Sequence, residues 1–462
     1  MREKEPLRPP SAEDEVQAPA ASSIAAAWRQ YEIAGRCHDV GSAAFADAVA
    51  AAHASHVRLR CLCQPSGVEM YVARQPGQSG GYGVKRMPDS GWRHAPDCPS
   101  YSPAAALSGL GPLLGSAIAE DPVTGETALK LDFALVRMTG RAGPASGAAD
   151  SGSVSSVGAR LTLRGLLHYL WDEAELTRWQ AGFAGRRTWA TVRRHLLAAS
   201  ERKTTGREPL RLRMYVPEPF FVDERDAIDA RRAADWSKAV GGLSGPRPLM
   251  LLIAEVKEIV PARYGFKLTV KHLPDPSFAI DEVMYRALAR RYEAELSLWA
   301  ANEDVHMIVI ATFGVNSAGV AALEELCLMP VTRQWLPVDD GFGKQLCDRL
   351  VAAGRTFTRT LRYNAPTSAS LPFAVALDCE PEPVVLQILA LDVPASDGTS
   401  SSDGAPTWSW CPAREPMPAL PLPAALQRAR PDAPLDASSQ TQADERHRAS
   451  TKDIRNLNGD AP

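Results

Sequence analysis

The stretch LMLLIAEVKEI, residues 249–259, decides the fold class because a continuous apolar run ends in charged residues. An apolar run of this length, bounded by turn residues, is typical of a buried strand. It is also far shorter than the roughly 18 continuous apolar residues that a membrane-spanning helix needs. The sequence therefore predicts a globular fold built around buried strands, with no membrane partner.

Working outward from this stretch, strands and helices alternate over residues 217–392, and this order predicts a mixed α+β domain. The expected strands are 249–259, 266–272, 305–313, 323–331, 356–363, 373–378 and 384–391, and the expected helices are 279–300 and 343–353.

The rest of the chain divides by composition into further units. They are a disordered or variable N-terminus (1–41), a helix (42–54) and a small β module with a strand at 127–138 (together 42–139), a Gly/Ser/Ala linker (140–159), a basic helical module (160–216) and a disordered tail (393–462). The fold class expected is thus α+β and multi-domain, with a small zinc-binding β module, a winged-helix-like module and a mixed C-terminal domain.

The net charge is distributed unevenly. The 462 residues carry 51 Lys and Arg against 54 Asp and Glu, a formal charge of −3. Residues 56–101 nevertheless hold six basic and three acidic residues, and residues 160–213 hold twelve and five, so these segments carry +3 and +7. Basic segments favour polyanionic partners. Nucleic acid, and DNA in particular, is therefore the expected partner.

Cysteine and histidine residues form the sharpest chemical pattern. Cys61 and Cys63 are followed by His94 and Cys98, two close pairs of the ligand types that structural zinc takes. A module this small has little core, so a metal would supply stability that burial cannot. We expect these four residues to bind Zn²⁺, with Cys37, His38, His53 and His56 as nearby competitors. Buried thiols beside an ordinary histidine are the alternative.

Two sets of basic residues are candidates for contact with nucleic acid. Basic groups neutralise phosphates, and exposed aromatic rings such as Tyr71, Tyr82 and Trp92 can stack on bases. A helix at 186–200 with a basic face suits a winged-helix arrangement, in which the 202–209 turn is the wing. A solvated face is the alternative for both sets, and Trp171 and Trp179 are expected in the core. The candidates are Arg58, Arg60, Lys85, Arg86, Arg93, Arg186, Arg187, Arg193 and Arg194.

A strand that ends in Glu255-Val256-Lys257 also has the form of a nuclease site. In restriction-endonuclease-like folds the carboxylate binds a divalent ion such as Mg²⁺ and the lysine stabilises charge on the phosphate. Such a site needs a second carboxylate on a preceding strand. Asp223, Asp226 and Asp229 lie upstream, but their segment does not have the pattern of a strand. Glu255 and Lys257 are therefore catalytic candidates only under this alternative.

Several stretches together resemble a bacterial family of unknown function that is met on plasmids and integrative elements. The stretches are RCLC (60–63), MYVAR (70–74), HAPDCPSY (94–101), WDEAELTRW (171–179), AEVKEI (254–259) and WLP (335–337). The resemblance covers most of residues 55–392. It implies a mobile-element context and supports treating the four Cys and His residues as one motif, but it implies no activity.

Three functions follow as hypotheses. The first is a cytoplasmic nucleic-acid-binding protein with a structural zinc site, because the charged N-terminus has no apolar core of secretory type and eight cysteines without such a signal are typical of a reducing compartment. The second is a metal-dependent nuclease. The third is a protein-interaction scaffold that docks through TWSWCP, residues 407–412, with Trp408 and Trp410 as the contacts.

Overall fold

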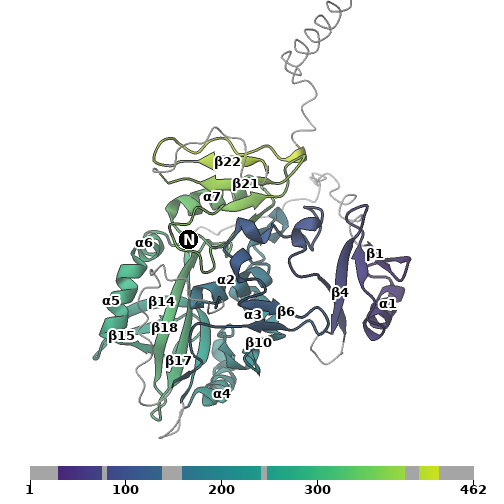
Figure 1. Ribbon diagram of the computed structural model, residues 1–462. Coiled ribbons are helices and arrows are strands. Elements are labelled where there is room, and N and C mark those ends of the chain that lie inside the picture. Colours follow the sequence, from purple (N-terminus) through teal and green to yellow (C-terminus); the bar gives the residue numbers. More distant parts are fainter. Residues whose placement is uncertain (1–29, 75–80, 138–158, 241–246, 391–404, 426–462) are drawn as a thin grey trace, which may run out of the picture.

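A computed structural model describes residues 30–74, 81–137, 159–240, 247–390 and 405–425 of the chain (Figure 1). Residues 1–29 of the N-terminus expected to be disordered or variable, and nearly all of the expected linker, lie outside these ranges. The expected α+β class is confirmed, since helices and several β-sheets alternate along the chain.

A closed β-barrel forms the centre of the molecule. Its strands pair in the order β14-β15-β16-β18-β17, and β17 then pairs with β14 again. All of these pairs are antiparallel except β16 with β18. The strands are β14 (Met250–Pro261), β15 (Phe266–Val270), β16 (Phe278–Ile280), β17 (His306–Val315) and β18 (Ala321–Val331).

The barrel can close because β14 serves two neighbours. Its first half, Met250 to Glu255, pairs with β17, and its second half, from Val256, pairs with β15. A register shift between Val256 and Glu258 separates the halves. Such a bulge adds bend and twist to a strand. The change from apolar to charged residues in this stretch coincides with the bend.

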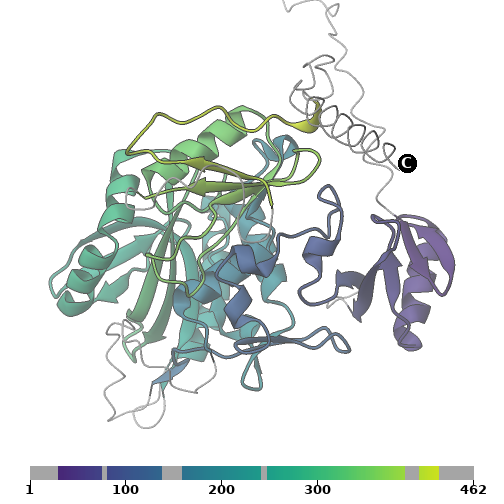
Figure 2. The ribbon, with the colours of Figure 1, turned by 45° about the horizontal axis from the view of Figure 1, so that its top comes forward.

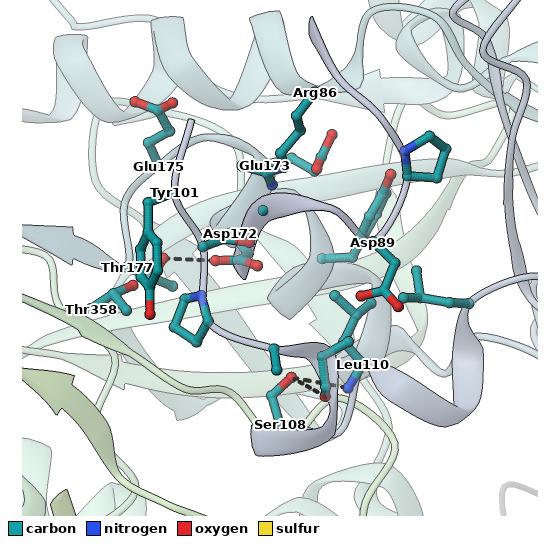
Figure 3. Close-up of a pocket in the computed structure, with 18 of the residues that line it drawn as sticks. Arg86, Asp89, Tyr101, Ser108, Leu110, Asp172, Glu173, Glu175, Thr177 and Thr358 are labelled. Atoms are coloured by element: carbon teal, nitrogen blue, oxygen red, sulfur yellow. Dashed lines mark hydrogen bonds between the residues drawn. The ribbon is translucent and has the colours of Figure 1, made fainter. Parts of the chain in front are cut away.

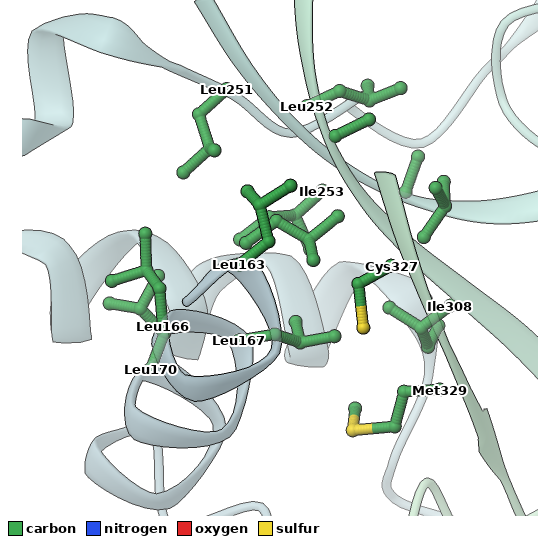
Figure 4. Close-up of a cluster of buried hydrophobic side chains, with 14 of the residues drawn as sticks. Leu163, Leu166, Leu167, Leu170, Leu251, Leu252, Ile253, Ile308, Cys327 and Met329 are labelled. Atoms are coloured by element: carbon green, nitrogen blue, oxygen red, sulfur yellow. The ribbon is translucent and has the colours of Figure 1, made fainter. Parts of the chain in front are cut away.

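Helix α2 (Leu163–Glu173) covers the outside of this barrel. Leu163, Leu166, Leu167 and Leu170 recur at helical spacing and face Leu251, Ile253 and Ile308 of the strands (Figure 4). Each leucine buried in this way contributes about 1.5–3 kcal/mol. Because both faces of β17 and of the first half of β14 are covered, these segments are almost uniformly apolar.

Two helices, not one, connect β16 to β17. The expected helix at 279–300 begins with strand β16 and then continues as α5 (Glu282–Arg291) and α6 (Glu293–Ala301). The single-helix prediction was wrong because Phe278 and Ile280 complete the barrel and Tyr292 interrupts the helix. The side chain of Asp281 caps the new N-terminus by accepting from the backbone N–H of Met284.

The Cys/His module is a separate five-stranded antiparallel sheet (Figure 2). The expected helix is present as α1 (Ala43–Ala54), and two strands lie within the segment expected to be variable. The strands, in sheet order, are β2 (Arg36–Asp39), β1 (Gln30–Ile33), β3 (Leu59–Cys61), β4 (Val68–Arg74) and β5 (Tyr82–Arg86).

The segment expected to be a winged helix is part of the main body. Helix α3 (Trp189–Ser200) shares the barrel's hydrophobic core through Trp189, Val192 and Leu196. The 202–209 turn contributes two strands to a sheet with two strands from residues 118–129, so a winged helix is not confirmed. That sheet has the order β11 (Glu208–Pro209), β10 (Lys203–Thr205), β7 (Thr127–Leu129) and β6 (Ile118–Glu120).

Short elements complete this part of the body. The strand expected at 127–138 is two short strands, β7 and β8, and a 3-10 turn, Leu210–Arg213, precedes β12. The additional elements are β8 (Val136–Arg137), β12 (Met214–Tyr215), α4 (Arg225–Trp236) and β13 (Arg247–Pro248).

A second sheet lies beside helix α7 (Gly341–Ala352) at the top of Figure 1. Its order is β22 (Thr407–Trp410), β21 (Val384–Ile388), β20 (Ala374–Ala376), β19 (Phe357–Arg359) and β9 (Arg178–Trp179). Residues 405–425 were expected to belong to a disordered tail. That prediction was wrong for this segment, because Trp410 is buried in the second core and β22 pairs with β21.

Among the described residues, no helix is long and apolar enough to cross a membrane.

Candidate metal centre and basic surfaces

Cys61, Cys63, His94 and Cys98 form one buried cluster. Cys61 ends β3 and Cys63 follows in the turn, whereas His94 and Cys98 lie in the loop after the short 3-10 helix Gly91–Arg93. One ligand atom from each residue lies within 4.8 Å of the others. The prediction that the chain folds these two pairs together is confirmed.

The distances in this cluster fit a tetrahedral metal ion. The Sγ atoms of Cys61 and Cys98 are 3.8 Å apart, and Nδ1 of His94 lies 3.3 Å from Sγ of Cys63 and 3.7 Å from Sγ of Cys98. Two sulfurs each about 2.3 Å from a tetrahedral ion lie about 3.8 Å apart. A disulfide would require about 2.05 Å. The set can therefore hold a metal through three sulfurs and Nδ1.

The electrostatics of the thiols also suit a cation. Hydrogen bonds from Cys61 and Cys98 lower the pKa of Cys63, while the hydrogen bond with Cys63 raises the pKa of Cys61. The opposite shifts mean that the neighbouring sulfurs do not all carry a negative charge at once, because adjacent thiolates would repel one another. A divalent cation would stabilise the thiolates together.

Competing ligands lie elsewhere. Cys37 is exposed, and the ring of His53 packs at 4.6 Å from that of Tyr82. Within the described ranges, the four-residue cluster is the one group of three or more candidate ligands that comes together. The core around it is small: Leu59 and Met70 are its largest fully buried side chains, and no aromatic ring is among its buried members.

The basic residues of this module fall into two groups. Arg58, Arg60 and Arg93 are exposed, and the guanidinium of Arg93 lies 5.3 Å from the ring centre of Trp92. Lys85 and Arg86 are half-buried and line a cavity between the module and the main body. Of the three aromatic residues expected to stack on bases, Tyr71 is buried, and its hydroxyl donates to Glu120.

The basic residues near helix α3 are also divided. Arg186 and Arg194 are exposed. Arg187, in contrast, donates to the carbonyls of Leu176 and Gln334, and burial lowers its pKa to about 10. Arg193 donates from Nε to the carbonyl of Val216 at 3.0 Å. Arg187 and Arg193 therefore stabilise the fold, and Arg186 and Arg194 remain available to a ligand.

The bulge of β14 falls at Lys257, two residues after Glu255. Glu255 is 3% exposed, and its Oε1 accepts from Nζ of Lys271 at 2.5 Å and pairs with Nδ1 of His306 at 2.6 Å. Lys257 faces solvent. No group of three metal ligands among the described residues includes Glu255. Burial would raise the pKa of Glu255, but the contacts with His306 and Lys271 together lower it, so the carboxylate already has two protein partners.

The barrel's connectivity is a feature that the sequence pattern missed. The five barrel strands, in chain order, pair antiparallel except for the third and fifth, which are parallel, and helices precede the fourth. This is the connectivity of the oligonucleotide- and oligosaccharide-binding (OB) fold. The turn from its first to its second strand, residues 262–265, carries Tyr264, which is 81% exposed. The guanidinium of Arg263 lies 5.3 Å from the centre of that ring. The RYG sequence of this turn was the available signal.

The family comparison agrees with the resemblance seen in the sequence. Residues 31–413 match the family described as "Protein of unknown function (DUF1173)", and the chain belongs to this family. That description says nothing of plasmids or integrative elements, so this association stays a prediction. No curated protein and no solved structure matches the chain. The OB connectivity accordingly rests on the strand pairing alone.

Proposed function

We propose that this protein binds nucleic acid through the outer face of its barrel, and that it carries a structural zinc ion in the Cys/His module. The OB connectivity of the barrel is the observation that supports nucleic-acid binding. In this fold the face of the second and third strands, with the adjoining loops, contacts single strands or sugars.

The residues on this face favour nucleic acid over sugar. Lys267 lies between the inward-facing Phe266 and Leu268, so its side chain faces solvent. Lys257 is exposed in the bulge of the neighbouring strand. Basic groups beside an exposed aromatic ring, here Tyr264, are typical of single-strand binding: the cations track phosphates and the ring stacks on a base.

The basic residues at α3 extend this surface. Lys271, directly after β15, contacts Glu255, which pairs with His306. The ring of His306 stacks on that of Trp335, with 4.4 Å between the ring centres. Arg187 bonds to the neighbouring Gln334. These contacts join the barrel face to the segment that bears Arg186, so that a strand could run from the 262–265 turn toward α3.

A labelled oligo(dT) strand, followed by fluorescence anisotropy at increasing KCl, tests the binding proposal. We expect affinity to fall as salt rises. Tyr264→Ala and the double variant Lys257→Gln/Lys267→Gln should each weaken binding about tenfold, within the 1–3 kcal/mol that a stacked base contributes. Lys130→Gln is the matched control, because Lys130 is also exposed but lies outside the barrel. Absence of binding at low salt would refute the proposal.

Zinc is the metal that best fits the proposed site in the Cys/His module. Three sulfurs with one imidazole nitrogen in a closed, buried set is typical of structural zinc, which needs no open coordination position. Cys61, Cys63 and Cys98 would bind as thiolates and His94 through Nδ1. The ion would fix the loop after β5 onto the sheet. Metal analysis of the purified chain should give one zinc per molecule.

The other two functions gain no support. A nuclease would need a second carboxylate near Glu255, whereas that side chain contacts Lys271 and His306. The docking peptide would need free tryptophans, but Trp410 is 3% exposed.

A further inference from the structure

Two carboxylates in the cavity between the Cys/His module and the main body are held by protein donors (Figure 3). Asp172 accepts from Oγ1 of Thr177 at 2.7 Å and from the hydroxyl of Tyr363 at 3.1 Å. Glu173 accepts from Nζ of Lys203 at 2.6 Å. A carboxylate on the outer face of the barrel, in contrast, has one protein donor and faces solvent.

This carboxylate belongs to Glu258, which lies opposite Thr269. The two residues pair across β14 and β15. Thr269 lies between the buried Leu268 and Val270, so both paired side chains point away from the core. Oγ1 of Thr269 donates to Oε1 of the exposed Glu258 at 3.3 Å, and it is the one hydrogen-bond donor to this carboxylate among the described residues. Because an ionised carboxylate has about four acceptor sites, most of its capacity is left to a ligand.

The neighbours of Glu258 belong to the proposed strand-binding face. Lys257 precedes it, and Lys267 is its diagonal neighbour across the strands, a position about 7–8 Å away. Val260 and Ala279 lie on either side of Lys267 in the sheet and add apolar surface against which a base can pack. A carboxylate repels phosphates that approach these lysines. Glu258 therefore suits a bound strand when a base, and not a phosphate, meets it.

Guanine is the base whose edge best matches a carboxylate. Single-stranded bases are bound through their Watson–Crick edges, and that of guanine carries two adjacent donors, N1–H and the N2 amino group. These donors meet the two carboxylate oxygens together. Cytosine and adenine offer an amino group beside an acceptor, and thymine offers one donor between two acceptors. Each of these edges places an acceptor against the second carboxylate oxygen, which is unfavourable.

We propose that Glu258 selects guanine in a bound single strand, and that Thr269 is a positioning residue that orients its carboxylate. The inference rests on the proposed binding of nucleic acid by the barrel face, and it specifies which base that face recognises.

Fluorescence anisotropy with the full chain tests the selection. The probes are labelled all-thymine strands of about twelve nucleotides, within the length that one OB fold covers, in which one central base is replaced by guanine, hypoxanthine, adenine or cytosine. The guanine strand should bind about tenfold more tightly than the all-thymine strand, as a bidentate base contact discriminates. Hypoxanthine lacks the N2 amino group and should lose most of this gain.

Three variants show whether Glu258 is responsible. Glu258→Gln should abolish the guanine preference and bind the all-thymine strand more tightly, because it removes a negative charge from the face. Thr269→Val keeps the charge, so it should reduce the preference without changing affinity for the all-thymine strand. Glu126→Gln is the matched control, because Glu126 is also exposed but lies before β7, outside the barrel. Melting temperatures show whether the variants fold.

The outcomes separate this selection from strand binding itself. Equal binding of the guanine and all-thymine strands by the wild type would overturn the selection and leave strand binding intact. A guanine preference that Glu258→Gln retains would overturn it as well. Absence of binding by every strand at low salt would refute the proposed function, and the selection with it.

Discussion

Nζ of Lys203 lies 2.6 Å from Oε2 of Glu173, which makes an ion pair between β10 and the end of α2. The same ammonium group donates to the hydroxyl of Tyr169 at 2.7 Å and to Oγ1 of Thr127 at 3.1 Å. Lys203 is 3% exposed. Burial alone would raise the pKa of Glu173, but the charge of Lys203 lowers it to about 2. One of the basic residues that suggested a DNA-binding wing thus holds the main body together.

Lys203→Met should destabilise the protein by about 1.5–3 kcal/mol, because it removes the buried ammonium group that donates to Glu173, Tyr169 and Thr127. Urea unfolding followed by circular dichroism measures this loss. The double variant Lys203→Met/Glu173→Gln should recover part of it, since no carboxylate is then left without its cation. A Lys203→Met protein as stable as wild type would contradict the importance of the pair.

The stability of the protein should fall as the pH is lowered below neutrality, because of His168. Nδ1 of His168 accepts from the backbone N–H of Tyr363 at 2.9 Å, so the ring must be neutral. Burial lowers its pKa to about 3. The unfolded chain, with an ordinary pKa of about 6.5, takes up the proton first. The contribution is therefore complete above pH 6.5 and is lost as the pH falls toward 3, by about 1.4 kcal/mol per pH unit.

Melting temperatures between pH 7 and pH 4 test this prediction. His168→Asn keeps an acceptor near the position of Nδ1 but does not titrate. The variant should show a shallower decline with pH than the wild type. Parallel declines would mean that other groups govern acid stability.

Removal of the proposed zinc ion should unfold the Cys/His module, because its core is small and the four candidate ligands sit within it. A strong chelator, or Cys61→Ser with Cys63→Ser, should abolish metal binding and expose residues 59–101 to limited proteolysis. Cys37→Ser is the matched control, since Cys37 is exposed and outside the cluster. Retention of stoichiometric zinc by the double variant would exclude these ligands.

Trp410→Ala should cost about 3–5 kcal/mol, the usual range for emptying a buried aromatic site. The indole is 3% exposed, packs edge-on against Phe342 and donates to the carbonyl of Glu415. Trp92→Ala serves as the control, because that ring is 50% exposed. Chemical denaturation compares the two. Equal stability of both variants would mean that β22 is not integral to the fold.

Local sequence patterns predicted the structure correctly where one helix or strand, or a spacing of a few residues, determines how the side chains lie. The leucines of α2, the apolar run of β14 and the two ligand pairs around Cys61 and His94 all lie as their spacing predicts. Each depends on periodicity or on ligand chemistry within a few residues. Trp171 and Trp179 are buried as expected.

Only the tertiary structure decided which charges are available and how the strands close. Arg186 and Arg187 are adjacent in sequence, yet one faces solvent and the other bonds to carbonyls from two distant segments. The short strand β16 contains only Phe278, Ala279 and Ile280, too few residues for a pattern, but it closes the barrel by pairing with β15 and β18. Burial and strand closure depend on contacts between residues far apart in the chain, and composition and periodicity carry no record of those contacts.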